Sequence, residues 1–155
     1  MAEPTPSDRT VCARVVLDLE AATPSAAIEQ LAAGFEGSVG VPPPRALTTA
    51  VMEREAQAAT FLGHRTALPH ARLIGVPHLS VVFGRARRPI PWTRDGDLVD
   101  LVFLGVVPAS QPRHYLEFMR MLARALVDDA RAEALRNAPD EPAVRAWLGE
   151  HLRLQ

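Results

Sequence analysis

The sequence is short of cysteine and of clustered positive charge. Cys12 is the single cysteine among 155 residues, which excludes an internal disulfide and a metal site built from several cysteines. We expect Cys12 to serve as a small apolar residue in an early strand. The net charge is -1 and there is no dense basic run, so the electrostatic footprint of a nucleic-acid-binding protein is missing. We therefore expect no nucleic-acid partner.

Long apolar runs are also missing. No stretch approaches the ~20 consecutive apolar residues that cross a bilayer, and the N-terminal residues lack the apolar core of a signal peptide. We expect a cytoplasmic protein that is not inserted in a membrane. With 48% hydrophobic residues and no internal repeat, residues 11–155 are predicted to form a single domain. Residues 1–10, rich in proline and polar residues, are predicted to be a flexible tail.

The first part of the domain is predicted to be a strand followed by two helices. Apolar and polar residues alternate through residues 11–20, a period of two that is typical of a half-buried strand. Thr23 and Pro24 resemble an N-cap and first helical position, and the helix that they open should end near Gly34. A run of three prolines then interrupts the chain before a second helix, residues 45–59.

The rest of the chain alternates between predicted strands and turns before it becomes helical. Residues 60–68 suit a brief strand or hairpin, and residues 78–84 suit a strand. Residues 98–107 are almost continuously apolar, which favours a strand covered on both faces. Between these strands, residues 87–97 contain two prolines and an Asp-Gly pair and are predicted to be a loop and turn. Helices are predicted over residues 112–127, 129–137 and 142–152. This order favours an α/β sandwich.

The segment around His70 is the clearest candidate for chemistry. Pro69 fixes its own backbone and favours an extended Leu68, so a strand that ends at Leu68 can present His70 on a loop. We expect an exposed imidazole, largely neutral at pH 7, that is free to act as a base, a metal ligand or a nucleophile. Arg72 adds a cation suited to a phosphoryl or carboxylate group. A surface Pro-His turn without a role is the alternative.

Two charged residues lie in apolar surroundings. Arg54 falls on the apolar face of the second predicted helix, with Leu47 and Val51. A guanidinium there should reach an anion, a carbonyl or the helix end, or else extend along its stem into solvent. Asp100 is the one charge in residues 98–107 and is expected to hold a loop amide or to pair with an arginine.

A set of spaced residues matches one family signature in the right order. The signature residues are Arg54-Glu55, Thr60, Gly63, Ala67, Pro69 and His70. The matches continue at Arg72-Leu73, Pro89-Ile90, Asp95-Gly96, residues 99–103 and Pro108. The chain thereby resembles the fructose/mannitol-type IIA domains of the bacterial phosphotransferase system, a family that includes the nitrogen-regulatory IIA proteins.

The resemblance implies a fold and a function. The fold is a three-layer-like α/β sandwich with a mixed central β-sheet flanked by helices. The function is that of a phosphocarrier whose His70 takes a phosphoryl group from the phosphohistidine of HPr or a related carrier. It then passes the group to a cysteine or histidine of a IIB partner, or uses its phosphorylated state as a regulatory signal. Because no IIB segment is identifiable, that partner must be another polypeptide. No cofactor is implied.

The chemistry suits the residues present. Neutral imidazole is a competent nucleophile, and phosphoryl transfer demands alignment and donors for three oxygens. Arg54 and Arg72 are expected to supply donors, together with the hydroxyl of Thr60 or Thr66 and local backbone amides.

The chain departs from the family pattern at two places. The family has a second histidine beside the active one, where this chain has Tyr115 and, one residue earlier, His114. Tyr115 shares a helical stripe with apolar residues and is expected to face inward, with His114 to one side. A tyrosine hydroxyl can donate to the His70 ring or to a phosphoryl oxygen, but it does not titrate near neutral pH. The alternative is that Tyr115 only packs against its apolar neighbours and that His114 is a solvated residue at the start of the helix.

The second departure is Arg65, where the family commonly has glycine. If that glycine adopts a positive φ, Arg65 implies a changed loop and adds positive charge near His70.

Two other functions are compatible with parts of the sequence. Tyr115 and Arg65 suit a regulatory protein-binding module that keeps the IIA fold without efficient phosphotransfer. His64, His70 and His78 suggest a metal-dependent hydrolase, although their spacing matches no recognised zinc pattern. The phosphocarrier is therefore the predicted function, and we expect no metal.

Overall fold

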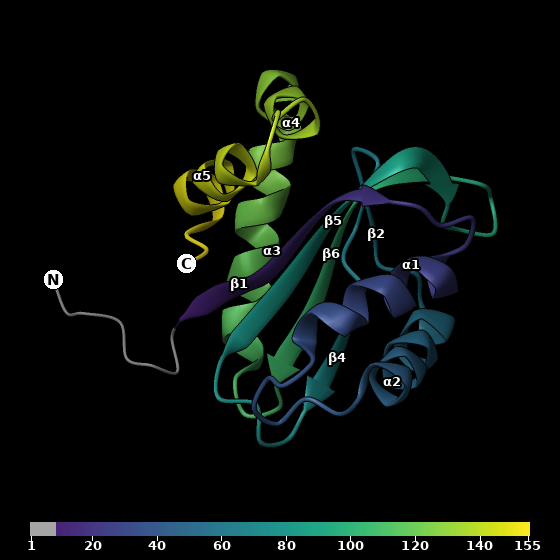
Figure 1. The fold of residues 1–155 in the computed structure, drawn as a ribbon, viewed down its shortest axis with the longest axis vertical. Helices are drawn as coiled ribbons and strands as arrows, with labels where there is room; N and C mark the ends of the chain where they lie inside the picture. The colour runs from purple at the N-terminus through teal and green to yellow at the C-terminus, as the bar shows by residue number, and fades with distance from the viewer. Residues whose placement is uncertain (1–8) are drawn as a thin grey trace, which may run out of the picture.

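The computed structural model describes residues 9–155, which form a mixed β-sheet between two layers of helices (Figure 1). The strands are β1 (Thr10–Leu19), β2 (Phe61–Gly63), β3 (Thr66–Ala67), β4 (His70–Leu73), β5 (Leu79–Pro91) and β6 (Leu98–Pro108). The helices are α1 (Pro24–Ala32), α2 (Pro44–Gln57), α3 (Pro112–Val127), α4 (Asp129–Arg136) and α5 (Glu141–Leu152), with a 3-10 turn at Ala33–Phe35. The predicted α/β sandwich is confirmed.

The sheet is centred on β5 and β6, which pair antiparallel. Strand order is β1-β5-β6-β3-β2, and β4 continues beside β6 beyond β3. β1 is parallel to β5, and β3 and β4 are both parallel to β6, so the sheet is mixed. β4 and the short β2–β3 hairpin therefore lie at the edge opposite β1.

Each face of the sheet carries one hydrophobic cluster. Alternate residues of β5 point to opposite faces, so Phe83 packs with Phe103 and Phe118 on the side of α3, α4 and α5. Val82 and Val102 pack on the other side, which α1 and α2 cover. Every residue of β6 after Leu98 is buried, as its continuous apolar run predicts.

The helix boundaries follow the expected local signals. The Thr23 hydroxyl accepts a hydrogen bond from the Ala26 amide at 3.1 Å, which caps α1, and Pro24 is the first helical residue. α3 spans the predicted residues 112–127 and also begins at a proline. The Asp128 carboxylate accepts from the Arg131 amide at 3.0 Å and caps α4.

Two backbone predictions are wrong. Residues 87–91 are not a loop, because Ile90 and Pro91 pair with β6 across a register shift that accommodates the prolines. His70 is not on a loop either: it is the first residue of β4 and pairs with Gly105. Pro69 has no amide hydrogen, but its carbonyl accepts from the Gly105 amide at 2.9 Å, so pairing with β6 resumes at once.

The predicted tail, residues 1–10, falls mainly outside the described residues. Residues 1–8 are outside the described residues, whereas Thr10 already belongs to β1 and is buried. Within residues 9–155, no helix is long and apolar enough to cross a bilayer.

Candidate active site

His70 begins β4 at the edge of the sheet, and its side chain lies against the first turn of α3. The residue is 6% exposed, which corrects the prediction of an exposed imidazole. The ring is covered by Tyr115, whose ring centroid lies 4.5 Å away at an interplanar angle of 38°. Tyr115 comes from α3, so its covering position over His70 results from tertiary packing.

Two oxygens converge on one nitrogen of the His70 ring. Nδ1 lies 3.0 Å from the Leu68 carbonyl oxygen and 2.8 Å from the Tyr115 hydroxyl oxygen. A carbonyl oxygen can only accept, so its contact requires a proton on Nδ1, and the hydroxyl oxygen can share that proton. This geometry favours the neutral tautomer whose lone pair is on Nε2.

Burial keeps both rings in their neutral forms. Desolvation lowers the pKa of His70 below its ordinary value of 6.5, and the nearby positive charge of Arg54 acts in the same direction. The hydrogen bond to the Leu68 carbonyl opposes this shift in the pKa of His70 without cancelling it. Burial raises the pKa of Tyr115, which therefore keeps its proton at neutral pH.

The two predicted arginines both act electrostatically on His70, and each donates to a backbone carbonyl. Arg54 lies on the buried face of α2 with Leu47 and Val51, as predicted, and its Nη1 donates to the Ala58 carbonyl at 3.3 Å. The expectation that Arg54 reaches a carbonyl at the helix end is confirmed. Arg72 is exposed on the same face of β4 as His70, and its Nη2 donates to the Ala109 carbonyl at 3.2 Å.

The hydroxyls of the two threonines named as candidate donors already donate to oxygens of the protein. The Thr60 hydroxyl donates to a carboxylate oxygen of Glu55, so its proton is not available to a phosphoryl group. Thr66 is fully buried in β3, and its hydroxyl donates to the His64 carbonyl at 3.0 Å. In both cases an oxygen close in sequence satisfies the hydroxyl.

Glu55, to which the sequence assigns no role, accepts three hydrogen bonds next to the site. Its carboxylate accepts from the Thr60 amide at 3.2 Å and from the Trp92 indole at 3.4 Å, in addition to the Thr60 hydroxyl. Its place next to Arg54 in the matched signature was the one signal in the sequence that pointed to it.

His114 is turned away from His70. Its Nε2 lies 2.8 Å from the Thr10 hydroxyl, at the start of β1. The structure therefore confirms the expected orientations, with Tyr115 facing His70 and His114 lying to one side. No structural contact supports a role for His114 at the His70 ring.

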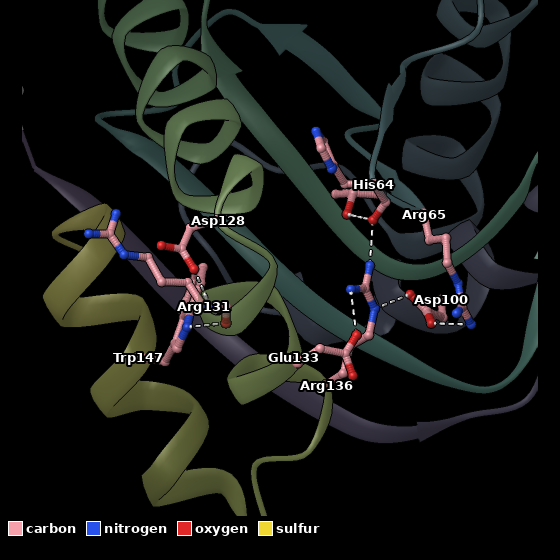
Figure 2. A network of polar contacts seen from close by, with 9 residues as sticks. His64, Arg65, Asp100, Asp128, Arg131, Glu133, Arg136 and Trp147 are labelled. Atoms are coloured by element: carbon pink, nitrogen blue, oxygen red, sulfur yellow. Dashed lines mark hydrogen bonds and ion pairs between the residues drawn. The ribbon is translucent and has the colours of Figure 1, made fainter.

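Asp100 pairs with two arginines at the end of the β3–β6 pairing that is remote from His70 (Figure 2). Its carboxylate lies 2.6 Å from Arg65 Nη2 and 3.1 Å from Arg136 Nε, while Arg136 also donates to the His64 carbonyl. The expected pairing of Asp100 with an arginine is confirmed. Arg65 has a φ of 55°, so this non-glycine residue adopts a positive φ in the turn.

The expected positive charge of Arg65 near the phosphoryl site is wrong. Thr66 pairs with Leu101, whereas His70 pairs with Gly105, four residues and about 13 Å further along β6. The Arg65 charge is balanced at the hairpin by Asp100.

The three histidines of the hydrolase hypothesis occupy different elements. His64 is in the β2–β3 turn, His70 begins β4 and His78 precedes β5. Across residues 9–155, no group of three or more histidine, cysteine, aspartate or glutamate side chains is placed to hold a metal ion.

Comparison with known proteins extends the geometric evidence. Residues 12–151 match the family model of the phosphoenolpyruvate-dependent sugar phosphotransferase system, EIIA 2. A nitrogen regulatory protein of Bradyrhizobium diazoefficiens is 33% identical over 105 residues, which are 67% of this chain and 69% of that protein.

Solved structures share the fold. The nitrogen regulatory protein IIA-Ntr of Neisseria meningitidis superposes with a TM-score of 0.80 and 27% identity, covering 90% of this chain and 95% of that one. A complex of enzyme IIAMTL and phosphorylated enzyme IIBMTL of Escherichia coli matches with a TM-score of 0.71 over 89% of this chain and 95% of that chain, and its 22% identity shows the fold alone. With the family model covering nearly all of the described residues, the chain belongs to the EIIA 2 family of the phosphoenolpyruvate-dependent sugar phosphotransferase system.

Proposed function

We propose that this protein is a phosphocarrier that accepts a phosphoryl group on Nε2 of His70. The observation that carries this proposal is the pair of oxygens at Nδ1, from Leu68 and Tyr115. They hold the proton on Nδ1 and leave the lone pair on Nε2 for attack. The lowered pKa of His70 keeps the ring in this reactive neutral form at pH 7.

The donor in this proposal is the phosphohistidine of an HPr-like carrier protein. The Nε2–P bond forms as the donor's N–P bond breaks, and the electron pair of the broken bond stays on the donor ring. Attack through Nε2 places positive charge on the His70 ring, and the Leu68 carbonyl stabilises the Nδ1–H of that ring. Arg54 and Arg72 provide positive charge for the phosphoryl oxygens, since both act electrostatically on His70.

The acceptor in this proposal is a IIB component or a regulatory target. Membership of the EIIA 2 family of a sugar phosphotransferase system supports a IIB acceptor. The 33% identity to a nitrogen regulatory protein supports use of the phosphorylated state as a signal. Both uses require the same reaction at His70.

A labelling experiment tests this function. The purified protein is incubated with enzyme I, HPr and radiolabelled phosphoenolpyruvate. We expect a base-stable, acid-labile label that is absent from His70→Ala and undiminished in His114→Ala, because His114 contacts Thr10 instead of the site. No label in the wild-type protein, or a full label in His70→Ala, would contradict the proposal.

A regulatory module without efficient transfer is the second candidate. It is favoured by Tyr115, whose raised pKa prevents it from exchanging protons as a second histidine does. In that case a partner protein would bind equally well to the wild type and to His70→Ala. Binding that disappears in His70→Ala would argue against this function.

A further inference from the structure

We infer that Glu55 is a positioning residue for His70, acting through Thr60 and Leu68. The function of this positioning rests on the proposed phosphoryl transfer. The structural evidence for it is a chain of hydrogen bonds. That chain runs from the end of α2 to the imidazole and does not involve Tyr115.

The first step of the chain fixes Thr60. Both the backbone amide and the hydroxyl of Thr60 donate to the Glu55 carboxylate, the amide at 3.2 Å. Two donors on one carboxylate restrain the rotation and the position of this residue more than either would alone. Thr60, which immediately precedes β2, is thereby fixed to the last turn of α2.

The second step carries this restraint to His70. The Thr60 carbonyl accepts from the Leu68 amide at 2.9 Å, and the Leu68 carbonyl accepts from His70 Nδ1 at 3.0 Å. The amide and carbonyl of Leu68 thus connect Thr60 to the imidazole. Because Pro69 follows Leu68 and restricts its backbone, a shift of Thr60 is expected to move the Leu68 carbonyl as well.

Glu55 is itself held from a second element. The indole Nε1 of Trp92, a buried residue just after β5, donates to the Glu55 carboxylate at 3.4 Å. The Trp92 amide donates to the Asp97 carbonyl at 2.8 Å, which fixes this residue to the β5–β6 turn. The carboxylate therefore joins α2, the β5–β6 turn and the segment before β2.

The consequence concerns which ring nitrogen of His70 carries the proton. With the Leu68 carbonyl in place, the Nδ1–H tautomer is favoured and Nε2 is the nucleophile. If Glu55 is lost, the Leu68 carbonyl loses the restraint that reaches it through Thr60, and the Tyr115 hydroxyl can donate to an unprotonated Nδ1 instead. The proton then moves to Nε2, where it blocks attack.

The test measures the tautomer of His70 directly. Long-range proton–nitrogen spectra of the 15N-labelled protein at pH 8 report which ring nitrogen is protonated when no donor protein is present. We expect mainly Nδ1–H in the wild type and at least a threefold fall in the ratio of Nδ1–H to Nε2–H in Glu55→Ala. Glu55→Gln should keep most of the wild-type ratio, because its amide oxygen still accepts from Thr60.

Two further variants make the result specific. Glu53→Ala removes an exposed glutamate from the same helix and should leave the ratio unchanged. Thr60→Val removes one of the two bonds to Glu55 and should shift the ratio in the same direction as Glu55→Ala, which keeps the test valid if Glu55→Ala does not fold. A wild-type ratio in the folded Glu55→Ala protein, or in Thr60→Val where Glu55→Ala is unfolded, would overturn the inference.

A rate measurement then connects the tautomer to transfer. We expect phosphorylation of His70 by the HPr-type donor to be slowed about tenfold in Glu55→Ala and much less in Glu55→Gln. If the wild type accepts no phosphoryl group while the tautomer still depends on Glu55, the proposed function fails and the positioning role stands. If transfer occurs and neither the tautomer nor the rate depends on Glu55, the positioning role fails alone.

Discussion

At the scale of single residues, the site depends on how Tyr115 and Leu68 share the Nδ1 proton of His70. Tyr115 stands where the resemblance predicts a second histidine, and its hydroxyl lies 2.8 Å from Nδ1 and so can restrain the ring. Its raised pKa means that this restraint does not titrate near neutral pH. We therefore expect Tyr115 to orient His70 rather than to exchange protons during transfer.

Replacing Tyr115 by phenylalanine should slow phosphorylation of His70 by up to tenfold. The ring packing is kept and one hydrogen bond is lost, which is worth about 1 kcal/mol. Initial rates with an HPr-type donor measure the effect, with His114→Ala as the matched control on the same helix. An unchanged rate in Tyr115→Phe would show that the hydroxyl does not contribute to transfer.

The lowered pKa of His70 predicts a pH dependence of stability. In the pH range between the lowered folded pKa and about 6.5, the unfolded state binds a proton that the folded state does not. The free energy of unfolding should therefore hold its full His70 contribution above about pH 6.5 and lose it as the pH falls through the folded pKa.

Urea denaturation between pH 8 and pH 5 measures this contribution in the wild type and in His70→Asn. The variant should lose less stability on acidification. His78, whose pKa burial also lowers, remains in both proteins and cancels in the comparison. Equal losses in the two proteins would rule out the contribution of His70.

At the scale of elements, the β2–β3 hairpin has a strained turn, and ion pairs hold that turn in place. His64 and Arg65 have φ values of 50° and 55°, the left-handed conformation that a two-residue type I′ hairpin requires. Neither residue is glycine, so each accepts a steric cost. The ion pairs of Asp100 with Arg65 and Arg136 hold this turn against β6 and α4 (Figure 2).

Two substitutions at Arg65 separate strain from charge. Arg65→Gly and Arg65→Ala both remove the ion pair with Asp100, but only glycine adopts a positive φ without steric cost. We expect Arg65→Gly to be about 1 kcal/mol more stable than Arg65→Ala in urea denaturation. Equal stabilities would mean that the turn changes its conformation in the variants.

Neutralising Asp100 should destabilise the protein clearly. Asp100→Asn leaves the guanidinium of Arg136, whose side chain is 14% exposed, without its buried anionic partner, at a cost of about 1–3 kcal/mol. Glu133 pairs with the same arginine but is 59% exposed, so Glu133→Gln should change stability by less than about 0.5 kcal/mol. Similar losses in the two variants would contradict the structural role of Asp100.

At the scale of the whole molecule, local patterns predicted the elements better than they predicted the site. The limits of α3 and the burial of β6 follow from a proline start and an unbroken apolar run, which are signals within the elements themselves. The extension of β5 through Pro91 was missed because it depends on pairing with Leu98 across the sheet. Local composition at this strand end favoured a loop.

The functional residues also divide into those that local sequence signals indicate and those that depend on tertiary contacts. His70 and Arg54 could be found from the sequence, because one follows a proline and the other is a charge on an apolar helix face. The burial of His70 could not, since Tyr115 covers it from α3, 45 positions away in the chain. The bonding of Thr60 and Thr66 to nearby oxygens, and the role of Glu55, likewise depend on side-chain orientation.

The most direct test of the central claim is the position of phosphorus in the phosphorylated protein. The 15N-labelled chain is phosphorylated with enzyme I, HPr and phosphoenolpyruvate, and the ring signals of its histidines are recorded. We predict phosphorus on Nε2 of His70, with the proton retained on Nδ1 beside the Leu68 carbonyl. Phosphorus on Nδ1 of His70, or on any other residue, would contradict the claim.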